Sequence, residues 1–413
     1  MAPVTLLVFL VNLFQVFFMT DNYTRLLNQL NPAQLKAVST IEGPVMVLAG
    51  PGTGKTQVLA MRIAAILQNT DTLPNNILAL TFTEAAAQNM RARLVSIVGN
   101  AGYQVVITTF HSFAQDIISR YPEYFLVGSS AQALTDIQRF QLFTNILVEE
   151  LQSELKLLRP LNQPTLYVQS VMSSISDLKR ENIAPTRFEE IIESEQSLLD
   201  TIQSELSKSE YTKKLKNIEK WRELLLAYQA YQRHLKEEHY YDFDDMIMFA
   251  NKALAENESL LVEFQEQFQY ILVDEYQDTN SAQTQLATHL VSYWGEQANI
   301  FVVGDPNQSI YRFQGASAEN VTQFLDRYPK ATVVALDQGY RCPQPIYDAA
   351  ATVIKNNSFV AQNTGITSQA TSEEDDFPIE VVAADNQLVE LVTVAKRIQL
   401  LLDDGVAADQ IAI

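Results

Sequence analysis

The sequence predicts an α/β protein in which one parallel sheet is interrupted by an all-helical subdomain. Short, apolar, β-branched runs alternate with stretches of helical spacing, a pattern typical of a buried parallel sheet. A glycine-rich loop joins one such run to a helix, and one long segment contains no strand-like run. The expected strands are Val45–Ala49, Ile77–Leu80, Val105–Thr108, Tyr270–Val273, Ile300–Val303 and Thr332–Leu336.

The helical insertion is expected over residues 112–241, between the third and fourth of these strands. Apolar side chains recur there at helical spacing, and we interpret their stripe as ordinary core packing. The stripe consists of Leu215, Ile218, Trp221, Leu225, Tyr228 and Leu235.

Length, charge and cysteine content limit the possible functions. A chain of 413 residues is long enough for roughly two to three domains, each with its own core. Cys342 is the only cysteine, so neither an internal disulfide nor a thiolate zinc cluster can form, which fits a cytoplasmic protein. The formal net charge of −20 argues against a broad basic surface, so any nucleic-acid site must depend on local grooves and base stacking.

The N-terminal residues are unusually apolar. Thr5–Met19 carries no charge, but it is short for a membrane span, which needs about 20 residues. It also lacks the basic start and the cleavage site of a secretory signal. We expect residues 1–18 to be a hydrophobic extension ahead of a true start at Met19; a weak membrane anchor and a buried helix are the alternatives. No stable membrane partner is expected.

A phosphate-binding loop follows the first predicted strand. Its glycines allow successive backbone N–H groups to surround phosphate oxygens, and the following helix N-terminus adds a favourable dipole. Lys55 is expected to reach the β- and γ-phosphates and Thr56 to ligate Mg²⁺. The predicted nucleotide-binding residues of this loop are Ala49, Gly50, Pro51, Gly52, Thr53, Gly54, Lys55 and Thr56.

Two carboxylates directly follow the predicted strand Tyr270–Val273. The carboxyl edge of a parallel sheet is where ligands bind, so this strand delivers both groups to the nucleotide. Asp274 suits Mg²⁺ coordination, and Glu275 is placed to orient or deprotonate an attacking water.

Further motifs accompany these two sites. They are Leu30–Gln34, Thr81–Ala86, Thr109–Ser112, Asp242–Asp245, Asp274–Asp278, Gly304–Tyr311 and Tyr340–Arg341. In order and spacing, residues 26–345 resemble the UvrD/Rep family of superfamily 1 DNA helicases. The resemblance implies a RecA-like P-loop NTPase fold and an ATP-dependent DNA helicase that uses ATP and Mg²⁺. It also implies 3′ to 5′ movement on single-stranded DNA and at junctions of single and double strands.

The resemblance assigns four further nucleotide contacts. Gln34 is expected to read the adenine edge and Tyr340 to pack on the adenine ring. Gln308 is expected to sense the γ-phosphate and to link it to DNA contact. Arg341 is expected to reach the γ-phosphate from the next domain, because a guanidinium stabilises developing phosphoryl charge.

A single-strand track is also implied by the resemblance. It runs over Phe82, Thr109, His111, Tyr311 and Phe313. Aromatic platforms suit binding without sequence preference, because every base offers a face for stacking. Such a track needs few positive charges, which is compatible with the acidic chain.

Three positions depart from the usual family pattern. Gln57 stands where many members carry an arginine beside the adenine, Phe313 replaces a common tryptophan and Gln314 a common arginine. These changes make the chain resemble the branch that includes RecB and AddA.

The domain boundaries follow from the same resemblance. Residues 19–111 and 242–335 are expected to form the first RecA-like domain, residues 112–241 its helical insertion, and residues 336–413 the beginning of a second RecA-like domain. Two further family motifs are not found before Ile413, so this second domain is expected to be truncated. Ile411–Ile413 is expected to be a strand cut at its end.

The activity expected of this chain is correspondingly partial. We expect it to bind ATP and Mg²⁺, to hydrolyse ATP poorly and not to unwind DNA, because hydrolysis needs donors from both domains. The alternative is a non-unwinding, ATP-gated module that interacts with nucleic acid or protein. RNA in place of DNA is a further alternative, since stacking platforms do not read the 2′-hydroxyl reliably.

Overall fold

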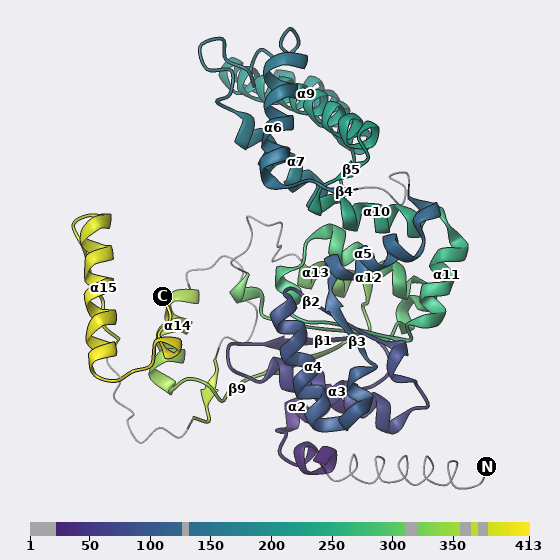
Figure 1. Ribbon diagram of the computed structural model, residues 1–413, viewed down its shortest axis with the longest axis vertical. Coiled ribbons are helices and arrows are strands. Elements are labelled where there is room, and N and C mark those ends of the chain that lie inside the picture. The colour runs from purple at the N-terminus through teal and green to yellow at the C-terminus, as the bar shows by residue number, and fades with distance from the viewer. Residues whose placement is uncertain (1–21, 126–131, 310–319, 356–364, 371–378) are drawn as a thin grey trace.

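A six-stranded parallel sheet forms the centre of the protein (Figure 1). The computed structural model describes residues 22–125, 132–309, 320–355, 365–370 and 379–413. The strands, in spatial order, are β3 (Val106–Thr109), β2 (Ile77–Thr81), β6 (Tyr270–Val273), β7 (Ile300–Gly304), β1 (Val45–Ala49) and β8 (Thr332–Leu336). All six predicted strands therefore form, each end within one residue of its expected position, and the predicted fold class is confirmed.

Helices cover both faces of the sheet because successive strand residues point to opposite sides. On one face, Val45 and Val47 of β1 belong to a core with a first group of helices, and on the other Met46 belongs to a core with a second group. The first group is α2 (Pro32–Ser39), α3 (Lys55–Asn69) and α4 (Glu84–Val98). The second group is α5 (Phe110–Arg120), α10 (Phe243–Glu256), α11 (Glu258–Gln267), α12 (Ser281–Val291) and α13 (Asn320–Arg327).

The helical insertion stands above the second group and has cores of its own (Figure 1). It contains α6 (Asp136–Asn145), α7 (Val168–Arg180), α8 (Pro185–Thr201) and α9 (Lys208–Glu237). On α9 the predicted stripe is core packing at Ile218, Leu225, Tyr228 and Leu235, whereas Trp221 keeps 37% of its surface exposed.

Two details of the insertion differ from expectation. The segment contains a two-residue parallel ladder, β4 (Gln132–Ala133) with β5 (Tyr240–Tyr241), where no strand was expected. Such short strands lack the apolar run by which a buried strand is recognised. The helix α5 packs into the core of the sheet, so the insertion's separate core begins only at Phe143.

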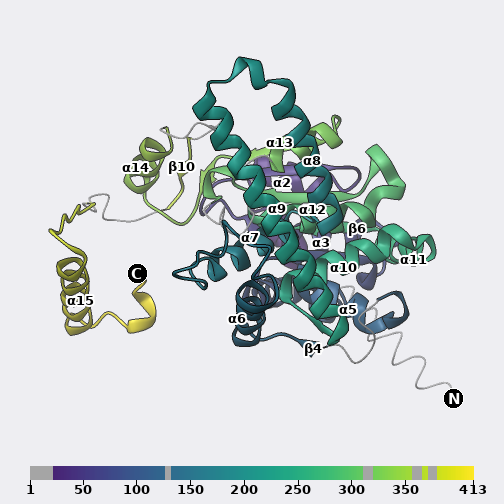
Figure 2. The same ribbon diagram turned by 90° about the horizontal axis from the view of Figure 1, so that it is seen from above.

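The C-terminal segment follows the last strand of the sheet. It contains β9 (Gln338–Gly339) paired in parallel with β10 (Thr367–Ser368), then α14 (Gln344–Ile354) and α15 (Gln387–Asp403). Both views place α15 away from the sheet, and none of its residues is buried (Figures 1 and 2). The expectation of a strand at Ile411–Ile413 is wrong: these residues are not in a strand, and the described part of the chain offers them no strand to pair with.

No helix in the described segments is both long and apolar enough to cross a membrane. The apolar extension, residues 1–18, lies outside the described residues.

A candidate nucleotide site at the carboxyl edge of the sheet

The phosphate loop turns sharply between β1 and α3. Gly52 and Gly54 have φ angles of 70° and 90°, in the left-handed region where a side chain is unfavourable. The fully buried Thr53 fixes the turn, because its hydroxyl donates to the carbonyl of Gly50 over 2.8 Å. The loop thereby delivers Lys55 at the first position of α3, as the sequence predicts.

Lys55 forms an ion pair with Glu275, one of the two carboxylates that follow β6. Its Nζ lies 2.8 Å from Oε2 of Glu275, with 11% and 35% of the two side chains exposed. The strands β1 and β6 that carry these residues are separated by β7 alone, so both ends reach one edge of the sheet. The structure thus brings together the residue expected to bind phosphate and the residue expected to activate water.

Glu275 has an unusual backbone conformation. Its φ of 46° and ψ of 48° are left-handed, which costs a non-glycine residue roughly 1–2 kcal/mol. Its backbone N–H donates to Oδ1 of Asp274 over 3.0 Å, and Nε2 of Gln277 donates to Glu275 Oε2 over 2.9 Å. The left-handed turn aims the carboxylate at Lys55 rather than along the strand.

The carboxylates of this edge carry uncompensated charge. Burial, and then the charge of Glu275, raise the pKa of Asp274 to about 7 and that of Asp278 to about 6. Burial also raises the pKa of Asp305. Lys55 is the cation that opposes these shifts, and a divalent ion would supply the missing positive charge. Asp274 therefore fits a Mg²⁺ ligand; Thr56, the other predicted ligand, follows Lys55 and is half-buried.

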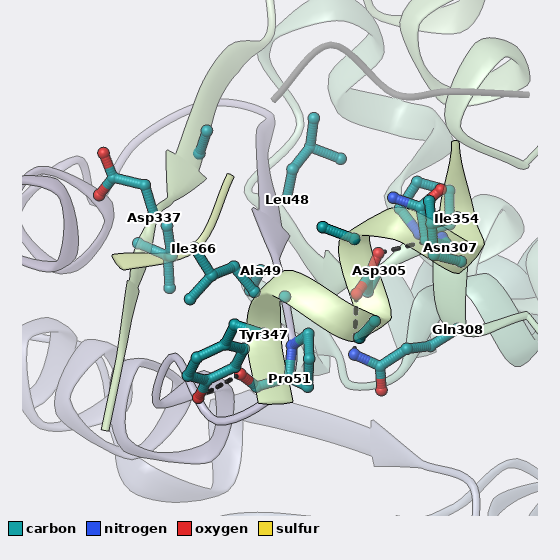
Figure 3. A pocket seen from close by; sticks show the side chains of 16 residues that line it. Leu48, Ala49, Pro51, Asp305, Asn307, Gln308, Asp337, Tyr347, Ile354 and Ile366 are labelled. Carbon is teal, nitrogen blue, oxygen red and sulfur yellow. Dashed lines mark hydrogen bonds between the residues drawn. The ribbon is translucent and has the colours of Figure 1, made fainter. Parts of the chain in front are cut away.

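A chain of hydrogen bonds links Glu275 to Gln308 through Gln277 and Asp305. Gln277 Oε1 accepts from the backbone N–H of Asp305 over 2.8 Å. Asp305 Oδ2 in turn accepts from Nε2 of Gln308 over 2.8 Å (Figure 3). A Cβ at Gly304 would lie 2.4 Å from Gln277 Oε1, so the close approach requires glycine. Sequence reasoning gave Gln277 no role, although it lies within the motif Asp274–Asp278.

The predicted base contacts lie on the other side of the loop. Gln34 Nε2 donates to the carbonyl of Thr53 over 3.0 Å, while its Oε1 accepts from the backbone N–H of Asn31 over 3.2 Å. An amide has two hydrogens and two acceptor lone pairs, so one of each remains for a base edge. The hydroxyl of Tyr340 accepts from Asn31 Nδ2 over 3.0 Å, while 46% of the tyrosine is exposed.

The C-terminal segment touches the phosphate loop itself. The backbone N–H of Tyr340 donates to the carbonyl of Gly52 over 2.9 Å. The hydroxyl of Tyr347 donates to the carbonyl of Pro51 over 3.2 Å (Figure 3). Arg341 is exposed, and its Cβ packs against Gly52. A pocket of about 210 Å³ separates the loop from α14, and Asp305, Gln308, Tyr347 and Ile366 are among the residues that line it.

The predicted DNA track is only partly described. Thr109 caps α5 and donates its hydroxyl to Glu84 over 3.0 Å, and Phe82 is half-buried after β2. The ring of His111 stacks on Phe243 with centroids 3.7 Å apart, and burial, then Arg180, lower the pKa of His111 to about 4.

Two members of the track, Tyr311 and Phe313, lie outside the described residues. The sequence did not indicate a role in the track for Phe243, although this residue lies in the motif Asp242–Asp245. It is 63% exposed, which is unusual for a phenylalanine. A neutral imidazole and an open phenyl ring together form an aromatic surface on which a base could stack.

Comparison with known proteins agrees with this geometry. Residues 30–329 match the model of the UvrD/REP helicase N-terminal domain. The chain is 35% identical over 381 residues to the ATP-dependent DNA helicase PcrA of Bacillus subtilis, covering 92% of this chain and 46% of the relative. It is 36% identical over 333 residues to PcrA of Staphylococcus epidermidis and of Staphylococcus aureus, covering 81% of this chain and 41% of each relative.

The chain thus spans less than half the length of these relatives. The family match extends from the motif before α2 to the end of α13 and so includes the phosphate loop, both carboxylates and the helical insertion. The chain belongs to the UvrD/REP helicase family.

Proposed function

We propose that this chain binds ATP with Mg²⁺ and forms the first half of the motor of an ATP-dependent DNA helicase. The observation that supports this most strongly is the 2.8 Å contact between Lys55 and Glu275 at one edge of the sheet. The whole protein is proposed to move 3′ to 5′ on single-stranded DNA, to act at junctions with duplex and to work in the cytoplasm.

The proposed division of labour follows the hydrogen bonds. Lys55 leaves Glu275 and binds the β- and γ-phosphates, which frees the carboxylate to accept a proton from water. Asp274 and Thr56 hold Mg²⁺, which supplies charge stabilisation when it is bound. Gln277 holds the carboxylate in place during this exchange.

Coupling to DNA is proposed to run through Gln308. The Gln308 amide donates to Asp305, and Gln277 hydrogen-bonds to both Asp305 and Glu275. A displacement of the Glu275 carboxylate is therefore proposed to displace Gln308. Arg341 is proposed to turn toward the γ-phosphate, and Tyr340 and Gln34 to contact the base. Phe82, Thr109, His111, Tyr311 and Phe313 are proposed to contact single-stranded DNA.

The domain division is also a proposal. Residues 19–111 and 242–335 form the first domain, residues 112–241 its insertion, and residues 336–413 the opening of the second domain. The separate cores of the sheet and of the helical insertion support two such units, but residues 113–125 pack into the core of the sheet, so the cores favour a boundary later than residue 112.

One pair of measurements tests this function. ATP binding is measured by calorimetric titration with Mg²⁺, and ATP turnover is measured with and without an oligo(dT) strand. Lys55→Ala is expected to abolish binding, and Glu275→Gln to bind ATP without turnover. Lys36→Ala is the matched control, because this exposed lysine of α2 lies outside the site. Undiminished binding in Lys55→Ala would overturn the proposal.

The turnover measurement also decides between the two expected activities. Strong DNA-stimulated turnover that is lost in both variants identifies a complete motor site. Binding with little turnover supports a chain that needs donors from a further domain, or the alternative of a non-unwinding, ATP-gated module. Duplex unwinding by the full-length protein separates these two, and competition by oligo(U) tests RNA as the track.

A further inference from the structure

A pocket lies between α6 and α7 of the helical insertion, on a part of the chain outside all of the motifs (Figure 1). Its volume is about 420 Å³, within the range of roughly 300–1,000 Å³ usual for small-molecule sites. Its walls are fixed, because Phe143 of α6 and Val171 and Ile175 of α7 belong to one core. Asp136, Arg139, Phe140, Ser173, Ser176 and Arg180 are among the residues that line it.

Arg139 supplies a cation whose donors are only partly used. Its Nη2 donates to the hydroxyl of Ser176 and, over 3.4 Å, to the carbonyl of Met172. Its Nε is buried with no hydrogen-bond partner among the described residues, and Asp242 Oδ2 lies 3.7 Å away. A guanidinium has five N–H donors in a planar fork that matches phosphate oxygens, so Arg139 can hold an anion and keep these contacts.

Arg180, near the end of α7, brings a second guanidinium to the pocket. Its Nε lies 3.3 Å from Asp244 Oδ1, and its Nη1 lies 3.5 Å from Asp177 Oδ1. A strong charge-assisted hydrogen bond is shorter, roughly 2.7–2.9 Å, so a phosphate can compete for this cation. Among the described lining residues Asp136 alone is acidic, so the lining carries more positive than negative charge.

Phe140 gives the pocket an aromatic wall. It follows Arg139 on α6 and keeps 44% of its surface exposed. Every nucleobase offers a face that stacks on such a ring, and the exposed Ser173 adds a hydroxyl for hydrogen bonds. Two guanidinium groups beside an aromatic ring match the two halves of a nucleotide, its phosphate and its base.

We propose that the pocket between α6 and α7 is a second nucleotide site, separate from the phosphate loop. It takes a nucleoside monophosphate unit, with the phosphate on Arg139 and Arg180 and the base on Phe140. Two sources have this chemistry, a nucleotide within a single strand and a free nucleotide. Arg180 contacts Asp244, the neighbour of Phe243 in the chain, so the pocket adjoins the aromatic surface of the predicted track. The strand source rests on the proposed function, whereas the site itself does not.

Binding of dTMP to the full chain carrying Lys55→Ala isolates this site, because that change disables the phosphate loop. Equilibrium dialysis measures the affinity, with inorganic phosphate as a second probe. Phe140→Ala is expected to weaken dTMP binding roughly 5- to 100-fold, the contribution of one stacked base, and to leave phosphate binding unchanged. Arg139→Met is expected to weaken both ligands at least about tenfold, because a charged hydrogen bond is lost.

Two matched variants serve as controls. Ile137→Ala shortens an exposed apolar side chain of the same helix that is not among the described lining residues. Arg187→Met removes an exposed arginine elsewhere in the insertion. Each is expected to change dTMP affinity less than twofold, and thermal unfolding checks every variant. If Arg139→Met fails to fold because Arg139 lies near Asp242, the exposed Phe140 still decides the question.

An oligo(dT) strand distinguishes the two sources. If the pocket holds a nucleotide of a strand, oligo(dT) displaces dTMP, and Phe140→Ala weakens oligo(dT) binding as well. If the pocket holds a free nucleotide, oligo(dT) does not displace dTMP, and its own affinity is unchanged in Phe140→Ala.

Three results would overturn the proposal. They are an absence of dTMP binding, a dTMP affinity that stays within twofold in Phe140→Ala, and an inorganic phosphate affinity equal to that of dTMP, which would leave no contact to a base. Failure of the unaltered chain to bind ATP would contradict the proposed function alone, because dTMP binding is measured with the phosphate loop disabled.

Discussion

At the scale of single residues, Glu275 balances two roles that conflict. Its carboxylate neutralises Lys55, yet the same lysine is needed for phosphate. In Glu275→Gln the ion pair is lost and the negative charge near the phosphates is removed. We therefore expect this variant to bind ATP more tightly, by about 0.5–1 kcal/mol because the pair is partly solvent-exposed. Calorimetric titration at constant ionic strength measures the change, and weaker binding would contradict the interpretation.

Asp274 gives a pH-dependent prediction. Because its pKa is raised to about 7 from an ordinary 3.8, the folded chain binds this proton more tightly than the unfolded chain. Its contribution to the free energy of unfolding therefore grows as pH falls from 7 toward 4, by on the order of 1 kcal/mol per pH unit. At pH 7.5 Asp274 is mostly ionised, and its buried charge destabilises the folded chain. Asp274→Asn has no such charge, so the variant should be more stable than the unaltered chain at this pH.

Urea unfolding in EDTA at pH 7.5 and pH 5.5 measures that difference. Groups that titrate equally in both proteins cancel, and the advantage of Asp274→Asn should shrink by about 1–2 kcal/mol at the lower pH. An advantage that stays constant between the two pH values would show that Asp274 does not titrate in this window.

Local motifs made part of the site predictable. Lys55 and Glu275 stand within short patterns whose chemistry depends on neighbouring residues, and the structure joins them. Gln277 and Phe243 could not be found in the same way. Their places in the site depend on contacts with Asp305 and His111, which lie 28 and 132 positions away in the chain.

At the scale of elements, the inner strands were predictable because they are apolar runs buried largely on both faces. In β2 and β6 every residue is buried, which leaves no polar alternation to confuse the pattern. The order of the strands was not predictable in the same way, since β6 enters between β2 and β7 only after the whole insertion. The ladder of β4 and β5 is too short to leave a pattern.

A buried charge cluster joins the insertion to the sheet domain. Nζ of the fully buried Lys179 on α7 lies 2.7 Å from Asp242 Oδ2 and 2.7 Å from Asp245 Oδ1 at the start of α10. Burial alone would raise the pKa of Asp242, but Lys179 and then Arg139 lower it below its usual value. Burial and the charge of Asp242 raise the pKa of Asp245 to about 6.

Removal of the central cation should therefore destabilise this junction strongly. Lys179→Met keeps the stem but removes the cation that contacts both buried carboxylates and leaves only Arg139, 3.7 Å from Asp242; the loss is expected to cost about 3–5 kcal/mol. Lys252→Met is the matched control, because its partner Glu256 is 3.9 Å away and both side chains are exposed; a change below about 0.5 kcal/mol is expected. Chemical unfolding measures both, and equal effects in the two variants would refute the special role of Lys179.

At the scale of the whole molecule, the phosphate loop is also the place where the C-terminal segment meets the sheet domain. The backbone N–H of Tyr340 and the hydroxyl of Tyr347 donate hydrogen bonds to the carbonyls of Gly52 and Pro51, which both belong to the phosphate loop. We therefore expect a movement of the loop on nucleotide binding to reach α14 through the hydroxyl of Tyr347, and the preceding strand through the backbone N–H of Tyr340.

The net charge of −20 leads to a prediction about DNA binding. If single-stranded DNA is held mainly by stacking on rings such as His111 and Phe243, few phosphates are neutralised and few counterions are released. With about two phosphate contacts, affinity for an oligo(dT) strand should fall less than about tenfold between 50 and 200 mM NaCl, given a slope near −0.7 per phosphate.

Fluorescence anisotropy of a labelled strand across this salt range measures the slope. Phe243→Ala should weaken binding by about 1–3 kcal/mol, the contribution of one stacked base, without changing the slope, because it removes a stacking surface and no charge. A loss of more than about a hundredfold across the salt range would instead require five or more phosphate contacts. Binding would then depend on a local basic groove, despite the negative net charge of the chain.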